Sequence, residues 1–206
     1  MSSEILLAIE TCFGKCSVCL YKNGNFYEKT EEKKNNHTNS LPQFTQELFN
    51  EDKITIQDLN GIIINHGPGS FTGIRIGIAF ALGLTSPFQT PLYGISTNEA
   101  QILDTTPTTT IIHAIKNTAY IQEFQNGIPK NEIIHTEIEP ILTNNTYNNP
   151  QFINFPENNP YNIPHISTPN AKSFIKRYLF IKPKIYSTPL YIRPINATIG
   201  AIKFIK

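Results

Sequence analysis

The first hundred residues alternate short apolar runs with polar turns, a pattern that predicts a mixed sheet. Residues 5–12 and 16–22 have the length and composition of strands, and Asn23-Gly24 predicts a hairpin into a third strand at 25–32. The elements predicted next are a helix at 40–49, a strand at 61–65, a helix after Gly69 and a strand at 91–96. The order β-β-β-α-β-α-β describes a ribonuclease-H-like unit, in which helix-linked parallel strands extend an antiparallel meander.

The second half of the chain begins with the same arrangement. Strands are predicted at 110–115 and 118–124, and Asn126-Gly127 predicts a turn into a third strand at 130–138. A short strand at 152–155 and a helix at 171–180 follow a polar, loop-rich stretch. The repeated meander predicts a duplicated, two-lobed α/β fold. We expect residues 1–100 to form the first lobe and 101–206 a reduced second lobe, with the boundary near 97–109.

Composition and charge narrow the function without identifying it. A net charge of +1 gives no overall attraction to nucleic acid or to a membrane surface. The N-terminus has no basic region, Glu10 interrupts its apolar run, and no apolar stretch reaches the length of a membrane span. Cys12, Cys16 and Cys19 lack a fourth ligand at zinc spacing, so we interpret them as structural thiols. We expect a cytoplasmic protein without a membrane partner.

Common catalytic motifs fit the glycine-rich stretch at 67–83 poorly. Ile74 follows Gly73 where a phosphate loop needs lysine, and Pro68 removes a backbone donor that a dinucleotide loop would use. A nuclease on this fold would need converging carboxylates, yet the strand at 61–65 ends in Asn65-His66, so we interpret Glu10 as a polar strand-end residue. The five histidines are scattered singly. The sequence therefore predicts no catalytic residue, no metal ligand and no bound cofactor.

The helix after Gly69 carries an unusual number of glycines for its length. On a helical wheel one face holds Gly73, Gly77, Phe80 and Leu84, with Ile76 at its edge, and the opposite face is apolar as well. A helix that only covers a sheet should be polar on one side. We therefore expect one face to cover the sheet and the glycine face to let a partner helix approach closely.

Several segments resemble one known family. The run GPGSFTGIRIGIAFALGL at 67–84 is similar to the signature of the TsaB (YeaZ-type) proteins, bacterial paralogues of TsaD in the actin-like ATPase superfamily. The shorter segments that also resemble this family are LLAIET and CSVCLY in the first hairpin, HTNSLPQF at 37–44, GISTNEA at 94–100 and PLYIRP at 189–194. The resemblance is specific over residues 5–100, weak over 101–185 and present again in the tail.

The resemblance implies a non-catalytic subunit of the complex that forms threonylcarbamoyladenosine beside the tRNA anticodon. Its partners would be a TsaD-type catalytic subunit and a TsaE-type ATPase, with tRNA reached through the complex and a homodimer possible without them. In the family the two N-terminal helices form the partner interface. Carried onto this chain, the interface residues are Leu41, Phe44, Leu48, Gly73, Ile76, Gly77, Phe80 and Leu84.

One departure and one alternative accompany this hypothesis. The family usually opens its second lobe with Asp-Ala-Arg, where this chain has His113-Ala114-Ile115, so a role of that lobe toward TsaE or tRNA is in doubt. The alternative is an active small-molecule kinase or ATPase of the same superfamily. Its second phosphate hairpin would have to be built from HAIKNT, at 113–118, which contains neither glycine nor an acid.

Overall fold

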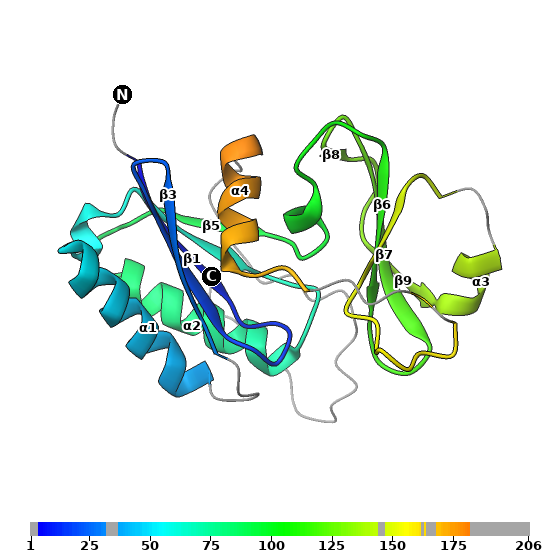
Figure 1. The fold of residues 1–206 in the computed structure, drawn as a ribbon, viewed down its shortest axis with the longest axis horizontal. Helices are drawn as coiled ribbons and strands as arrows, with labels where there is room; N and C mark the ends of the chain where they lie inside the picture. Colours follow the sequence, from blue (N-terminus) through cyan, green and yellow to red (C-terminus); the bar gives the residue numbers. More distant parts are fainter. Residues whose placement is uncertain (1–3, 32–36, 144–146, 162, 164–167, 182–206) are drawn as a thin grey trace, which may run out of the picture.

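The computed structural model describes residues 4–31, 37–143, 147–161, 163 and 168–181. Two five-stranded sheets organise this part of the chain (Figure 1). The elements of the first sheet and its connections are β1 (Ile5–Glu10), β2 (Ser17–Lys22), β3 (Asn25–Thr30), α1 (His37–Asp52), η1 (Ile56–Asp58), β4 (Gly61–Asn65), α2 (Phe71–Thr85) and β5 (Leu92–Ile95). Those that follow are η2 (Glu99–Gln101), β6 (Thr108–His113), β7 (Thr118–Gln125), β8 (Ile128–Pro129), β9 (Ile134–Glu137), α3 (Ile138–Thr143), β10 (Pro150–Ile153) and α4 (Ala171–Ile181).

The first sheet has the predicted order of elements. Its strands lie in the order β3-β2-β1-β4-β5, with β1–β2 and β2–β3 antiparallel and β1–β4 and β4–β5 parallel. Asn23 and Gly24 both have positive φ, at 53° and 84°, which suits the two-residue hairpin turn between β2 and β3. One local expectation is wrong. Ser40 does not begin the first helix, because α1 already includes His37, and the Ser40 hydroxyl instead donates to the Glu31 carboxylate at 2.6 Å.

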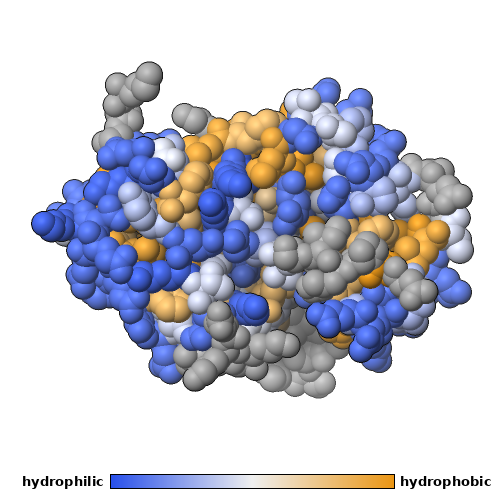
Figure 2. All heavy atoms as spheres, in the orientation of Figure 1, coloured by the Kyte–Doolittle hydropathy of each residue, from blue (hydrophilic) through white to orange (hydrophobic). Residues whose placement is uncertain are grey.

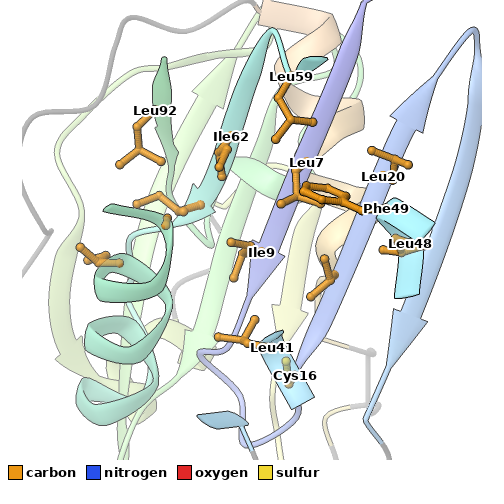
Figure 3. Close-up of a cluster of buried hydrophobic side chains, with 14 of the residues drawn as sticks. Leu7, Ile9, Cys16, Leu20, Leu41, Leu48, Phe49, Leu59, Ile62 and Leu92 are labelled. Atoms are coloured by element: carbon orange, nitrogen blue, oxygen red, sulfur yellow. The ribbon is translucent and has the colours of Figure 1, made fainter. Parts of the chain in front are cut away.

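Apolar residues on both faces of the first sheet explain its almost continuous hydrophobic strands. Leu7 and Ile9 of β1 face the core beneath α1 and α2, whereas Leu6 and Ala8 face the core beneath α4 (Figures 1 and 3). Since successive side chains of a strand point to opposite faces, a strand covered on both sides must be apolar throughout.

The second sheet repeats the first in reduced form. Its strands lie in the order β10-β6-β7-β8, with β9 also paired to β7, and β10 runs parallel to β6. The path β9-β7-β6-β10 therefore matches β3-β2-β1-β4, as the predicted duplication requires. Asn126 and Gly127 have positive φ, and they make the predicted turn. The predicted single strand at 130–138 is wrong in extent: within this range only β9 is a strand, and α3 begins at Ile138.

Helix α4 lies against the first sheet although it comes last among the described elements. Its buried residues Ala171, Phe174 and Ile175 pack in the core that contains Leu6 and Ala8. The division of the chain at residue 100 stays a prediction, but α4 packs with the first lobe. We use "first lobe" for β1–β5 with α1, α2 and α4, and "second lobe" for β6–β10 with α3. The tail motif at 189–194 lies outside the described residues.

Candidate functional site

The glycines of α2 face the protein's own sheet. A Cβ atom built on Gly73 would lie 2.0 Å from the Thr11 carbonyl oxygen, and one on Gly77 would lie 2.6 Å from Thr11 Oγ1. The Thr11 hydroxyl donates to the Gly73 carbonyl at 2.8 Å, and the Ser70 amide donates to the Cys12 carbonyl at 2.9 Å. The start of α2 therefore packs directly on the chain that leaves β1.

The predicted orientation of this helix is wrong. Gly73 and Gly77 were expected on the face that meets a partner helix, but both are buried together with Ile74, Ile78 and Ala81. The close approach that the glycines allow is to Thr11 at the end of β1. A helical wheel could not decide between the two apolar faces. The choice depends on which face fits against Thr11, which lies 62 residues before Gly73 in the chain.

Beside the buried glycines, α2 carries a half-buried apolar stripe. Ile76, Phe80 and Leu84 follow one another at four-residue intervals, so they lie on one face. Gly83, which directly precedes Leu84, is exposed in the last turn of α2, and a Cβ atom there would meet nothing within 4 Å. Phe44 of α1 is half-buried against the same core. We call Phe44, Ile76, Phe80, Gly83 and Leu84 the α1–α2 surface.

The eight residues predicted for partner binding thus fall into three groups. Phe44, Ile76, Phe80 and Leu84 belong to the α1–α2 surface. Leu41 and Leu48 are each 1% exposed and lie in the core between α1 and the sheet (Figure 3). The third group is Gly73 and Gly77, described above. The partner-binding role of the surface itself stays a prediction.

A cluster of buried polar groups lies where β1, β4 and β5 end. Glu10, the last residue of β1, is 3% exposed, which confirms its interpretation as a strand-end residue. Its carboxyl accepts from the Cys12 amide and from Asn65 Nδ2. Asn65 Oδ1 in turn accepts from the Gly67 amide at 2.9 Å and from the Thr97 hydroxyl at 3.1 Å.

The environment of Glu10 disfavours its charged form. Burial raises the pKa of this carboxyl to about 7, although the hydrogen bonds from Cys12 and Asn65 act in the opposite direction. With a pKa of about 7, the enclosed Glu10 carboxyl is uncharged at pH values well below 7. The Glu47 carboxylate of α1 pairs with Lys29 on the surface at 3.0 Å and does not join Glu10.

The three cysteines lie in the core. Cys12, Cys16 and Cys19 are at most 1% exposed and form no disulfide. Burial raises the pKa of the Cys16 and Cys19 thiols to about 12, and it raises that of Cys12 as well. Since the thiolate is the reactive form, these are unreactive structural thiols, as the sequence predicted.

A cleft of about 570 Å³ lies between the two lobes. Its lining residues come from both lobes: His66, Ser96, Glu99, Gln122, Pro129, Lys130, Asn131, Glu132 and Ile133. Gln122 Oε1 is buried and has no hydrogen-bond partner among the described residues. Sequence reasoning missed this cleft because its walls come from separate segments. The one available signal was the row of polar residues after β4 and β5, since ligand sites of open sheets lie at the carboxyl ends of parallel strands.

The described residues include neither a candidate metal site nor a candidate membrane span. No group of three or more His, Cys, Asp or Glu residues in them could hold a metal ion. Likewise, none of their helices combines the length and apolar character that crossing a membrane requires.

Comparison with known families gives one match over more than half of the chain. The family model described as TsaD: tRNA N6-adenosine threonylcarbamoyltransferase matches residues 28–145. Among curated proteins, the tRNA threonylcarbamoyladenosine biosynthesis protein TsaB of Buchnera aphidicola subsp. Schizaphis graminum is 41% identical over 95 residues. That match covers 46% of this chain and 45% of the relative. TsaB of Escherichia coli K12 is 36% identical over 92 residues, which cover 45% of this chain and 40% of the relative.

These matched segments span less than half the length of either TsaB relative. A solved structure extends the comparison to the whole fold. YeaZ from Pseudomonas aeruginosa superimposes with a TM-score of 0.72 at 18% identity, covering 92% of this chain and all of that one. At such low identity the likeness concerns the fold alone, and it agrees with the predicted two-lobed α/β architecture.

Proposed function

Because this chain belongs to the TsaD family of tRNA N6-adenosine threonylcarbamoyltransferase proteins, with its curated relatives among the TsaB (YeaZ-type) members, we propose that it takes part in forming threonylcarbamoyladenosine on tRNA. We propose further that it is a non-catalytic cytoplasmic subunit. Its α1–α2 surface binds a TsaD-type catalytic partner, and a TsaE-type ATPase and tRNA join through the resulting complex.

The observation that supports this proposal is the half-buried apolar stripe of α2. A helix that covers a sheet normally presents charged residues to water, but Ile76, Phe80 and Leu84 present hydrocarbon. The neighbouring Gly83 offers no side chain, so another helix can approach its backbone closely. Apolar surface of this kind is typical of a site that a partner protein covers.

The non-catalytic part of the proposal draws on Glu10 and on the turn between β6 and β7. The Glu10 carboxyl accepts hydrogen bonds from the Cys12 amide and from Asn65 Nδ2, so groups of the chain itself occupy it. The turn that would form the second phosphate hairpin contains Lys116-Asn117, and Lys116 itself adopts a φ of 56°. Both features support a structural use of positions that a kinase would use for chemistry.

Reconstitution tests the proposed function directly. The chain is combined with purified TsaD-type and TsaE-type proteins, tRNA, ATP and threonylcarbamoyl adenylate as the activated donor, and threonylcarbamoyladenosine in digested tRNA is measured by mass spectrometry. We expect modification that depends on this chain. Equal modification without it would contradict the proposal, and so would ATP turnover by the chain alone that Glu10→Gln abolishes.

Gly83→Leu is expected to separate partner binding from folding. The leucine meets open space within the chain and is the better helix former, so the melting temperature should not fall. When a TsaD-type partner binds, this leucine fills the space that the partner helix would occupy beside position 83. The resulting overpacking costs about 1–3 kcal/mol, which weakens binding roughly 5- to 150-fold. Calorimetric titration measures the affinity, and Lys176→Leu, on the exposed face of α4, serves as the control.

The same surface is expected to pair with a second copy of the chain when no partner is present. Association would cover the apolar stripe that is otherwise left in water. Sedimentation analysis should then show a concentration-dependent dimer that Gly83→Leu weakens and Lys176→Leu leaves unchanged. A monomer at all concentrations would count against self-association through the α1–α2 surface.

A further inference from the structure

Helix α4 lies between the first sheet and the second lobe (Figure 1). One face of the helix is buried on the first sheet through Phe174, Ile175 and Tyr178. Figure 2 shows apolar surface around the position of α4. Phe180, near the end of this helix, is 42% exposed. A helix in this position can hold both lobes if a side chain reaches across to the second.

Arg177 is the side chain that reaches across. It is 1% exposed, although arginine is rarely buried without partners. Its Nη1 donates to the Ile102 carbonyl at 2.9 Å, and its Nη2 donates to the Gly127 carbonyl at 2.9 Å. Ile102 lies in the connection between the lobes, and Gly127 lies in the turn between β7 and β8. One guanidinium thus joins the first lobe, the connection and the second lobe.

Tight packing surrounds this contact. The carboxylate of Glu99 lies 3.7 Å from Arg177 Nη2, so the buried cation has an anion beside it. A Cβ atom on Gly127 would lie 2.6 Å from the Phe180 ring and 3.1 Å from the Asp104 carbonyl oxygen. The turn, the ring and the connection therefore leave one another little room to move.

A second buried contact joins the lobes at a different place on the second sheet. Asn98, which follows β5, is fully buried, and its Nδ2 donates to Thr110 Oγ1 of β6 at 2.9 Å. Two attachments, at Thr110 and at Gly127, oppose rotation of the second lobe about either one.

The cleft between the lobes lies beside these contacts. Glu99 lines the cleft and also neighbours Arg177. Closing the cleft by a hinge movement would shift the turn at Gly127 relative to Ile102, and it would separate a buried cation from at least one of its acceptors. Leaving a buried charge short of partners is strongly unfavourable, so such a movement is opposed.

We propose that Arg177 fixes the angle between the two lobes, so that this chain is a rigid body whose cleft does not close around a ligand. The inference is independent of the proposed function, because it concerns only contacts within the chain. It makes a definite statement about nucleotide: magnesium-ATP should leave the lobe angle unchanged, whether or not it occupies the cleft.

Pulsed electron paramagnetic resonance tests the proposal on the full chain. Spin labels are attached to cysteines introduced at the exposed positions Gln46 on α1 and Glu139 on α3. The native thiols are buried with raised pKa values, so they stay unlabelled. We expect one narrow distance distribution that magnesium-ATP does not shift. In Arg177→Gln the width should at least double, whereas Lys176→Gln, on the exposed neighbour, should match the parent.

Three results would overturn the proposal. They are a broad distribution in the parent protein, a shift of its distance on adding magnesium-ATP, or an unchanged narrow distribution in Arg177→Gln. Near-ultraviolet circular dichroism checks that the variant is folded. If it is not, Arg177→Lys replaces it, since lysine keeps the charge but cannot span both carbonyls with a planar fork, and intermediate broadening is expected.

Discussion

Gly73→Ala is expected to lower the free energy of unfolding by about 3 kcal/mol, because the added methyl group has no space. Its Cβ atom would lie 2.0 Å from the Thr11 carbonyl oxygen, which is backbone and cannot rotate away. Relief requires α2 to move from β1, and that movement breaks the hydrogen bond from the Thr11 hydroxyl to Gly73. For a chain of this length the melting temperature should fall by roughly 6–12 °C, as measured by circular dichroism or calorimetry.

Gly83→Ala is the matched control for this prediction. It makes the same change in the same helix, but the new methyl group meets nothing within 4 Å. The better helix propensity of alanine should then stabilise the isolated protein by up to about 1 kcal/mol. We therefore expect the free energy of unfolding to fall in Gly73→Ala and to rise in Gly83→Ala. Similar melting temperatures for both variants would mean that Gly73 does not pack on Thr11 as described.

Glu10→Gln is expected to change how stability depends on pH. The ordinary pKa of a glutamate is 4.5, and burial raises that of Glu10 to about 7 in the folded protein. Between these values the folded state holds a proton that the unfolded chain has released, so the free energy of unfolding falls as pH rises. The stability that this group contributes is complete below about pH 4.5 and is lost as pH rises through 7. The total loss is about 3 kcal/mol.

Glutamine keeps the carbonyl acceptor for Cys12 and stays neutral at every pH. The variant should therefore equal the parent near pH 4 and exceed its free energy of unfolding by about 3 kcal/mol at pH 8. Urea titrations at several pH values measure the free energy of unfolding of both proteins. Subtracting the parent's value from the variant's at each pH removes the contribution of the other titrating groups. Glu139→Gln, at an exposed position of α3, is the control. Parallel curves for the parent and Glu10→Gln would contradict the raised pKa.

Much of the fold followed from local patterns. The turns at Asn23-Gly24 and Asn126-Gly127 were predictable because few residues other than glycine and asparagine accept positive φ. The strand at Gly61–Asn65 was predicted with its observed bounds. The duplicated meander could be recognised because each turn fixes the pairing of its own neighbouring strands.

The candidate site was only partly predictable. The apolar residues Phe44, Ile76, Phe80 and Leu84 were identified as a group, since period and hydropathy are local properties of a helix. The burial of Leu41 and Leu48 in the core was not predicted, because residues one turn apart on a helix can differ in whether they face the core or the solvent. The polar cluster of Glu10, Asn65 and Thr97 was missed because strand ends meet only after the strands pair in the order observed.

By itself, the sequence determined the strands of the first sheet, the helices α1, α2 and α4 to within a few residues, where the meander repeats, and that α2 has two apolar faces. Only the tertiary structure decided which face of α2 turns inward, because that depends on the space beside Thr11 and not on the hydropathy of the helix. It also decided that α4 returns to the first lobe and buries Arg177 between Ile102 and Gly127. Contacts between residues so distant in the chain leave no periodic signal, since each depends on geometry that exists only once both lobes are packed.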